Sequence, residues 1–80
     1  MEQKQLDQGK VLSVRSSVVD VRFPKKAPPI RNVLTAGEKE DVIIEVFTQL
    51  DSNTIRGVAL TPTQGLARGS VVKDTGKPFE

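Results

Sequence analysis

The sequence contains no cysteine, histidine, tryptophan or tyrosine. Because cysteine is absent, disulfide bonds and thiolate metal sites are impossible. Because histidine is absent, the chain lacks the commonest metal ligand and the commonest general base at neutral pH. Three phenylalanines are the only aromatic residues, so few side chains could stack on nucleic-acid bases. These absences disfavour metal-dependent and histidine-dependent catalysis.

Long apolar runs are also missing. No stretch approaches the roughly 18 consecutive apolar residues of a membrane span. The start, MEQKQLDQGK, has no apolar core of a signal peptide, so we expect a cytosolic chain with a flexible arm at 1–8. Eighty residues suffice for one domain, which buries only about 60% of the unfolded chain's surface. The net charge of +2, from 12 basic and 10 acidic residues, indicates solubility rather than nucleic-acid affinity.

Short clusters rich in valine and isoleucine recur between glycines, prolines, asparagines and aspartates. β-Branched residues favour strands, and no window shows the sustained stripe of an amphipathic helix. The pattern therefore predicts an all-β fold with turns between the strands. The predicted strand segments are VLSV (11–14), VVDVRF (18–23), NVLTA (32–36), DVIIEVFTQL (41–50), TIRGVAL (54–60) and GSVV (69–72).

Side-chain alternation predicts which residues face the core, because residues two apart lie on the same face of a strand. The odd-numbered residues of Val19–Phe23 form one apolar face, whereas the preceding apolar residues, Leu12 and Val14, are even-numbered. If both sets face one core, the strand must bend or bulge near RSS (15–17). Gly57 indicates a second bend or a close approach. Short strands with bends and no helix predict a small closed barrel, because closure removes exposed strand edges.

The longest cluster has a second face that is not purely polar. Its main apolar face is formed by Val42, Ile44, Val46 and Leu50, together with Thr48. The opposite face carries Ile43 and Phe47 around Glu45 and Gln49, which indicates a contact surface for a partner. In the preceding loop, we expect Pro28 and Pro29 to rigidify a crossing of the barrel end while Ile30 docks inward.

The stretch TPTQGLARG (61–69) contains two glycines and an arginine, as some phosphate-binding loops do. A P-loop, however, needs four residues between its two glycines. Lysine and then serine or threonine must follow the second glycine directly, at the start of a helix. Here Gly65 and Gly69 are too close together, and a strand follows instead of a helix N-terminus. Pro62 and a left-handed Gly65 suit a turn. We therefore interpret the stretch as a turn.

Two further groups of residues have uncertain roles. Paired-carboxylate catalysis needs one carboxyl group in a dry pocket, and a filled small barrel has little room for one, so we expect surface or turn-capping roles for the acids. These acids are Asp20, Glu45, Asp51 and Asp74. Lys25, Lys26 and Arg31 form a basic loop, but Phe23 is expected in the core and Phe79 at the terminus, so stacking partners for nucleic acid are scarce.

Three segments carry a more specific pattern: GKVLSVRSSVVDVRFP, PPI and IRGVALTPTQGLARGSVVKDTGKP. From Gly9 to Pro78 the chain resembles the N-terminal domain of the catalytic beta subunit of rotary, F-type ATP synthases. The most specific part is AL followed by T-x-GLxRGxxVxDTGxP, whose signature residues are Thr63, Gly65, Leu66, Arg68, Gly69, Asp74, Thr75 and Gly76. The variant ALTPTQGLARG resembles a divergent bacterial branch such as the sodium-type synthases. Ser16 stands where the family pattern VRGSVVDV has glycine, a departure that affects the expected bend.

The resemblance implies a closed, six-stranded, Greek-key-like barrel at 9–75, followed at 76–80 by the start of a linker to an absent nucleotide-binding domain. It implies an excised domain that begins near the native start. In the family, barrels of three alpha and three beta subunits form a crown that holds the alternating hexamer together. The barrel itself then has no catalytic, metal-binding or cofactor-binding residue. Mg-ATP or Mg-ADP, the P-loop and the glutamate that activates the attacking water belong to the absent domain.

The implied partners are alpha subunits, in a headpiece that is cytoplasmic and peripheral to the inner membrane. Ile43 and Phe47 are the candidate contacts with these neighbours. Because one heterologous contact in a ring can be small, we expect the isolated domain to be monomeric or weakly self-associating. Two alternatives stay open from the residues alone: a fragment that itself binds or hydrolyses ATP, and a stand-alone barrel that binds single-stranded nucleic acid.

Overall fold

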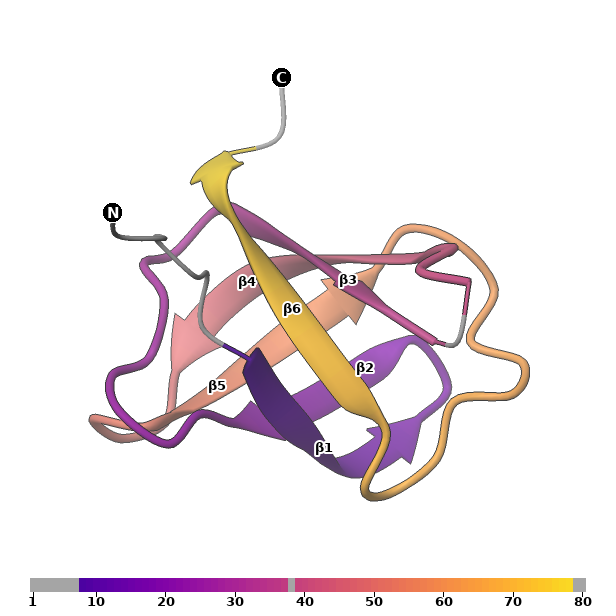
Figure 1. The fold of residues 1–80 in the computed structure, drawn as a ribbon, viewed down its shortest axis with the longest axis horizontal. Helices are drawn as coiled ribbons and strands as arrows, with labels where there is room; N and C mark the ends of the chain where they lie inside the picture. Colours follow the sequence, from indigo (N-terminus) through magenta and orange to yellow (C-terminus); the bar gives the residue numbers. More distant parts are fainter. Residues whose placement is uncertain (1–7, 38, 79–80) are drawn as a thin grey trace, which may run out of the picture.

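The computed structural model describes residues 8–37 and 39–78, which form six β-strands and no helix. The strands are β1 (Gln8–Arg15), β2 (Val18–Arg22), β3 (Asn32–Ala36), β4 (Val42–Gln49), β5 (Thr54–Ala59) and β6 (Val71–Pro78). They close into a barrel in the order β1-β2-β5-β4-β3-β6, with antiparallel neighbours throughout (Figure 1). β3, β4 and β5 are consecutive, and β5 returns beside β2, as in a Greek key. The predicted closed six-stranded all-β barrel is confirmed.

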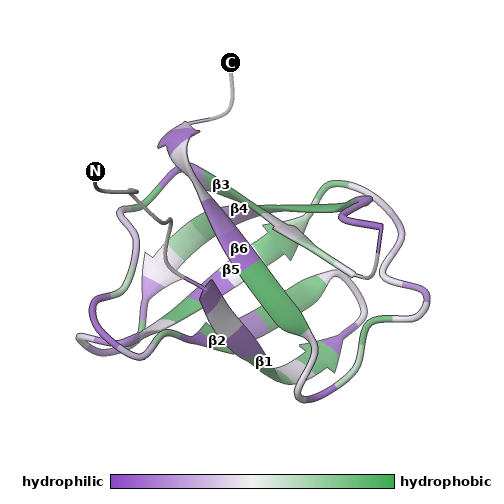
Figure 2. Ribbon diagram, in the orientation of Figure 1, coloured by the Kyte–Doolittle hydropathy of each residue, from purple (hydrophilic) through white to green (hydrophobic). Residues whose placement is uncertain are grey.

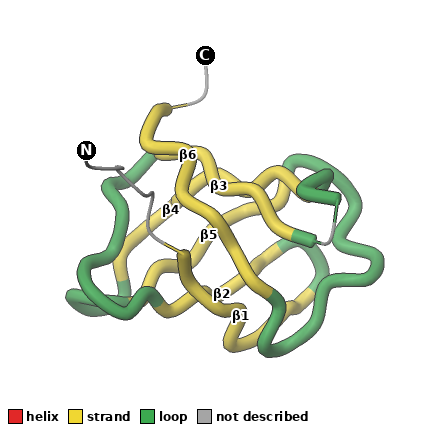
Figure 3. Tube along the Cα trace, in the orientation of Figure 1, coloured by secondary structure: helices red, strands yellow, loops and turns green. Residues whose placement is uncertain are grey.

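Loops gather at the two ends of the barrel (Figure 3). At one end, the loop 24–31 packs against the β4–β5 turn, where the Ala27 amide donates to the Ser52 carbonyl at 2.9 Å. At the other end, the loop 60–70 lies near the β1–β2 turn, and the Thr63 hydroxyl donates to the Ser16 carbonyl at 3.3 Å. The strands therefore form the wall, and the loops cover its openings.

The core follows the alternation that the sequence predicts. Val19, Val21 and Phe23 are fully buried, and apolar and polar stretches alternate along the strands (Figure 2). The largest fully buried side chains come from β1, β2, the residue after β2, β3, β4, β5 and β6: Val11, Val19, Val21, Phe23, Leu34, Ile44, Val46, Ile55 and Val72. Every strand thus contributes to one continuous apolar centre.

Gly57 marks a close approach, as the sequence indicates. It lies on β5 between Val19 of β2 and Val46 of β4. A Cβ atom at this position would lie 2.5 Å from Cγ2 of Ile44 and 3.0 Å from the carbonyl oxygen of Glu45. Only a residue without a side chain fits this space, so β5 approaches β4 closely at this position.

The prediction of a bend or bulge near RSS (15–17), within one long strand, is wrong. Residues 15–18 form a hairpin turn between two separate strands, in which Arg15 pairs with Val18. The register change lies earlier, between Val11 and Ser13, where Leu12 is an extra residue that is 40% exposed. The hairpin explains the change of parity, because it pairs even-numbered Val14 with odd-numbered Val19, and the bulge turns Val11 rather than Leu12 toward the core.

A second bulge corrects two further expectations. The pairing of β4 with β5 shifts between Val46 and Thr48, so Phe47 is the extra residue and is 65% exposed. Beyond this bulge the strand no longer follows the original alternation, and Leu50 is 46% exposed instead of sharing the buried face. Ile30 does not dock inward and is 54% exposed, because Ala27 and Pro28 fill the barrel end in its place.

The edges of the domain are described only in part. β1 begins at Gln8 and β6 continues to Pro78, where it pairs with Asn32 through an irregular stretch. The expected arm at 1–8 falls almost wholly outside the described residues, and so does Phe79. In the part of the chain that the structure describes, no helix could cross a membrane.

Candidate functional site

The loop 60–70 contains most of the signature residues and joins β5 to β6. Four amides between Leu66 and Ser70 already have acceptors within the chain. Leu66 donates to the Thr63 carbonyl at 2.9 Å, Ala67 to the Ser70 hydroxyl at 3.0 Å, Gly69 to the Val11 carbonyl at 2.8 Å, and Ser70 to the Ala67 carbonyl at 2.9 Å. A phosphate-binding loop needs amides that point together at an anion. This loop instead uses its amides to hold its own shape and to attach to β1.

The conformation of the loop explains its glycines and its leucine. Gly65 and Gly69 have φ values of 88° and 91°, and no atom would lie within 4 Å of an added Cβ. Glycine is therefore favoured there by backbone conformation and not by lack of space. Leu66 points inward, is only 9% exposed and belongs to the core cluster. Arg68 remains exposed. The loop is a turn that seals the barrel.

The other signature residues, Asp74, Thr75 and Gly76, lie on β6 where it pairs with β3. We call this strand pair the β3–β6 seam. The Asp74 carboxylate accepts hydrogen bonds from the Asn32 side-chain amide at 3.1 Å and from the Gly76 backbone amide at 2.9 Å. The Thr75 hydroxyl donates to the Val33 carbonyl at 2.7 Å. Gly76 has a φ of 80°, a left-handed conformation that suits glycine. The register of this strand pair shifts between Asn32 and Leu34, so these side-chain bonds secure an irregular stretch.

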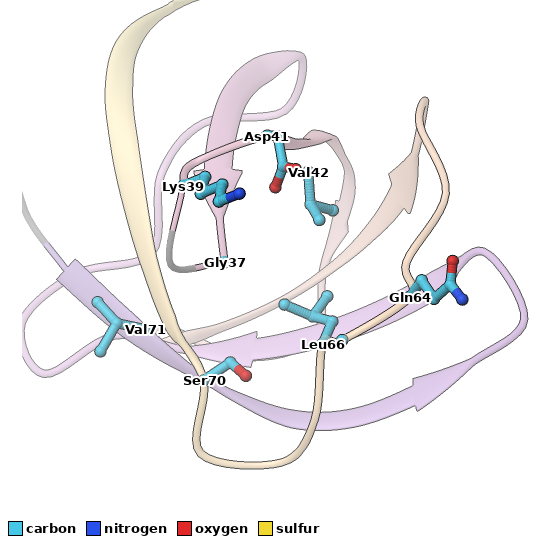
Figure 4. A pocket seen from close by; sticks show the side chains of 9 residues that line it. Gly37, Lys39, Asp41, Val42, Gln64, Leu66, Ser70 and Val71 are labelled. Carbon is cyan, nitrogen blue, oxygen red and sulfur yellow. The ribbon is translucent and has the colours of Figure 1, made fainter.

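A hollow of about 760 Å³ lies between the β3–β4 turn and the loop 60–70 (Figure 4). Lys39 and Asp41 line it from the turn, and Gln64 and Leu66 line it from the loop. Of the described residues that line it, Lys39 and Asp41 are charged, exposed and of opposite sign, and the buried Leu66 belongs to the core cluster. Within the described residues, no group of three or more acids that could hold a metal ion occurs, here or elsewhere.

The four candidate carboxylates lie on different elements, and three of them, Asp20, Asp51 and Asp74, accept structural hydrogen bonds. Asp20 on β2 forms a fork with Arg56 on β5, at 2.9 Å to Nε and 3.1 Å to Nη2. The hydrogen bond from Arg56 holds the pKa of Asp20 below its ordinary value of 3.8, against the opposing effect of burial. The same bond raises the pKa of Arg56. This pair joins two strands and is not poised for proton transfer.

Asp51 caps the β4–β5 turn. One of its carboxylate oxygens accepts hydrogen bonds from the backbone amides of Asn53 and Thr54, both at 2.8 Å. The bond from Asn53 is the main reason why the pKa of Asp51 lies below its ordinary value. Glu45 is half-buried on β4, between Val33 and Val58 of the neighbouring strands. Surface and turn-capping positions thus account for the acids.

The two candidate contact residues on β4 differ in their exposure. Ile43 is half-buried opposite Thr35, whereas Phe47 projects from the bulge. Phe47 instead shares a groove of about 240 Å³ with Ile30, Arg31 and Val58, whose walls also include Glu45 and Val46. We call this the Phe47 groove. Sequence reasoning placed Ile30 inside the barrel and therefore missed it; its position beside two prolines gave no signal of its outward direction.

The backbone around Arg31 positions this groove. Arg31 has a φ of 81°, which is unusual for a residue with a side chain. Its amide donates to the carbonyl of Val46 at 2.8 Å, immediately before the bulge at Phe47. The other members of the basic loop, Lys25 and Lys26, are exposed at the same end of the barrel. The loop is held by Asn53, whose side-chain amide donates to the carbonyls of Phe23 and Lys25.

Comparison with known proteins identifies the family to which this barrel is similar. The sequence model described as "ATP synthase alpha/beta family, beta-barrel domain" matches residues 11–76. ATP synthase subunit beta 2 of Shewanella frigidimarina is 54% identical over 71 residues, covering 89% of this chain and 15% of that protein. ATP synthase subunit beta 1 of Marinomonas sp. is 53% identical over 77 residues, covering 90% and 16%. ATP synthase subunit beta 2 of Polaromonas naphthalenivorans is 57% identical over 72 residues, covering 90% and 15%.

These similarities cover nearly the whole barrel, including the loop 60–70 and most of the β3–β6 seam. The chain spans about 15% of the length of the curated relatives that it matches. The barrel topology and the signature residues that close it agree with the family match. The chain therefore belongs to the ATP synthase alpha/beta family and represents its beta-barrel domain, with beta subunits as its relatives.

Proposed function

We propose that this barrel is a non-catalytic assembly module of an ATP synthase beta subunit. It packs beside the barrels of alpha subunits and holds an alternating hexamer together during ATP synthesis or hydrolysis coupled to ion transport. Mg-ATP and Mg-ADP bind to another domain of the complete subunit. The complex lies on the cytoplasmic side of the inner membrane and is peripheral to it.

The observation that carries this proposal is that the signature residues make structural contacts within the barrel. Leu66 fills the barrel end, Gly69 attaches the loop to Val11, and Asp74 and Thr75 bind β3. Residues that build a ligand site would keep polar atoms available for a ligand. Here the most specific part of the sequence makes a rigid closed wall, which is what an assembly module requires.

The Phe47 groove is the surface that we assign to a neighbouring subunit. An aromatic side chain that is 65% exposed on a bulge suits an anchor, because aromatic residues dominate the energetics of protein interfaces. Ile30 and Val58 extend its apolar surface, and Arg31 and Glu45 provide a charged edge. Ile43 lies farther along β4 and is a secondary contact.

The test uses a complete beta subunit in which this chain replaces the barrel of the Shewanella frigidimarina relative. Its assembly with the alpha subunit of the same organism is measured by native mass spectrometry. We expect the chimera to assemble and the substitution Phe47→Lys to reduce assembly at least tenfold, a loss of about 1.4 kcal/mol. Leu60→Lys is the matched control, because Leu60 is also an exposed apolar residue, at 45%, but lies outside the groove.

Thermal unfolding of each variant separates contact from folding. Phe47→Lys should leave the unfolding midpoint of the barrel nearly unchanged, because the side chain is already largely in water. Unfolding of this variant would show that Phe47 belongs to the core and would refute its role as a contact. Assembly equal to that of the Leu60→Lys control would refute the groove as an interface.

A further inference from the structure

β6 contains extra residues where it pairs with β3. Leu34 of β3 pairs with Asp74 of β6. The next pair, Asn32 with Pro78, leaves three residues of β6 opposite Val33 alone. Extra residues in one strand bend that strand and interrupt the ladder of backbone hydrogen bonds. The final part of β6 therefore leaves the regular wall of the barrel, and Figure 1 shows its end extending beyond the other strands.

The final part of β6 also lacks a neighbour on its other side. β1 pairs with β6 only from Lys10 opposite Val71 to Gln8 opposite Lys73. Beyond Lys73, β3 is the only strand within the described residues that pairs with β6. A strand end with one neighbour and an internal glycine is expected to fray. The resemblance to the family likewise places the start of a linker at 76.

Side-chain hydrogen bonds nevertheless hold this strand end. Oδ1 of Asp74 accepts hydrogen bonds from the Asn32 side chain and from the Gly76 amide. The Thr75 hydroxyl donates to the Val33 carbonyl at 2.7 Å, across the irregular stretch. Gly76 adopts a φ of 80°, which changes the direction of the chain directly after these bonds. We call Asn32, Asp74, Thr75 and Gly76 the exit clamp.

Asn32 anchors the exit clamp to the body of the barrel. It is only 9% exposed and is one of two buried polar residues among those described. Its backbone amide donates to the Pro29 carbonyl at 3.2 Å, and the preceding amide, of Arg31, donates to the Val46 carbonyl at 2.8 Å. A buried amide side chain that loses its partner is costly. Asp74 is therefore held against a fixed part of the wall.

We propose that the exit clamp fixes the direction in which the chain leaves the barrel, and so holds the barrel and the following domain in one orientation. This inference rests on the proposed function, in which the chain continues from β6 to a nucleotide-binding domain. A glycine at the end of an element would suit a hinge. Here Gly76 is bonded to Asp74, and Pro78 still pairs with Asn32 and has a restricted φ. The described part of β6 therefore contains no hinge.

A rigid exit also orients the Phe47 groove. Arg31 lines that groove, and the next residue, Asn32, belongs to the exit clamp. The groove and the following domain are therefore positioned by neighbouring residues of one anchored segment. A fixed orientation reduces the conformational freedom that subunits lose when they associate. The exit clamp thus prepares the complete subunit for assembly without contacting a neighbour itself.

The experiment measures the distance between the two domains of the chimeric beta subunit by pulsed electron paramagnetic resonance. This chain has no cysteine, so one nitroxide is attached at Ala67→Cys, an exposed position in the loop 60–70. The second is attached to a single cysteine in the nucleotide-binding domain. The distance distribution should be narrow in the chimera with an intact exit clamp. It should widen about twofold in Thr75→Val, because the freed strand end samples more conformations.

Thr75→Val removes the hydroxyl group with a residue that suits a strand, so the barrel should stay folded. Gly76→Val is a second variant, because a β-branched residue opposes the φ of 80° and should cause the same widening. Each variant has a matched control in the loop 60–70. Thr63→Val removes a hydroxyl-to-carbonyl hydrogen bond of the same kind, and Gly65→Val opposes a φ of 88°. Both controls should leave the distribution narrow.

The paired controls separate positioning from stability. A side chain with a merely structural role would lower the unfolding midpoint without widening the distribution. Equal distributions in Thr75→Val and Thr63→Val, or a wide distribution in the unsubstituted chimera, would overturn the exit clamp. The proposed function would then stand if the chimera still assembles with the alpha subunit. Conversely, widening confined to Thr75→Val and Gly76→Val in a chimera that does not assemble would support the exit clamp and refute the proposed function.

Discussion

Gly57 of β5 and Ile44 of β4 lie so close together that a Cβ atom at residue 57 would be 2.5 Å from Cγ2 of Ile44. Ile44 is fully buried and cannot turn away without leaving the core. The backbone of Glu45, at 3.0 Å from the same Cβ position, blocks movement on the other side. This contact is where the narrow barrel depends most directly on the absence of a side chain.

The first prediction concerns this contact. Gly57→Ala should lower the free energy of unfolding by about 2–3 kcal/mol, because an added methyl group overpacks a filled core. Gly65→Ala is the control, since nothing lies within 4 Å of its added Cβ and only its φ of 88° opposes alanine. That control should cost about 1 kcal/mol. Urea unfolding measures the free energy of unfolding of both variants. Equal losses would show that the contact with Ile44 adds no cost to Gly57→Ala.

The second prediction concerns the β1–β2 hairpin. Ser16 has a φ of 57° in a two-residue turn, a conformation that costs a residue with a side chain about 1–2 kcal/mol. Ser16→Gly should therefore raise the unfolding midpoint by about 4–8 °C per kcal/mol recovered. Ser17→Gly, at the adjacent position without a positive φ, should not stabilise the barrel. A rise for Ser17→Gly and not for Ser16→Gly would contradict the turn geometry.

The third prediction concerns the ion pair between Asp20 and Arg56. The pKa of Asp20 is lowered in the folded state, so the pair stabilises the barrel fully above the unfolded value of 3.8. This stability is lost as the pH falls through the lower, folded pKa. Titration of the Asp20 carboxyl carbon by NMR should give a midpoint below 3.8, and Arg56→Gln should move it upward. An unchanged midpoint in Arg56→Gln would exclude Arg56 as the cause.

Asp51 provides an internal control for that titration. Its pKa is also lowered, but chiefly by the backbone amide of Asn53 and not by Arg56. Its midpoint should therefore stay below 3.8 in the Arg56→Gln variant. A parallel shift of both acids would indicate a general change in the fold rather than loss of one ion pair.

The fourth prediction concerns nucleotide. Calorimetric titration of the 80-residue chain with Mg-ATP should release no heat of binding, because the amides of Leu66, Gly69 and Ser70 already have acceptors within the chain. The complete chimeric subunit is the positive control. Tight binding by the 80 residues alone would refute the assignment of the loop 60–70 as a turn and the proposed non-catalytic role.

Much of the fold is predictable because strand formation here is local. Alternating valines and isoleucines identify the first five strand regions, and Val19, Val21 and Phe23 are buried as their parity requires. The predicted segment 69–72 covers only the first two residues of β6, because the rest of that strand is largely polar. The close approach at Gly57 is equally predictable, since glycine inside a strand indicates such an approach. Parity fails at Leu12 and Leu50, because each lies at or beyond a bulge. A bulge depends on how a strand pairs with its partner, which no single segment encodes.

The candidate surfaces are less predictable for the same reason. The apolar Ile43 and Phe47 are visible in the sequence, but only the fold brings Phe47 beside Ile30, 17 positions away. Likewise, only the register places Lys10 of β1 against Arg22 of β2. Charge counted along the chain shows an excess before residue 31 but not the face on which it gathers.

The sequence by itself determined five of the strands and the start of the sixth, the closed all-β class, the buried odd-numbered face of β2 and the family, because these follow from local alternation and from a continuous signature. Tertiary structure alone decided the outward direction of Ile30, the bulges at Leu12 and Phe47, the left-handed turn at Ser16 and the meeting of Lys10 with Arg22. The physical reason is that closing six short strands into one narrow barrel fixes a register between distant segments. That register determines which side chains lie beside one another on the outer surface.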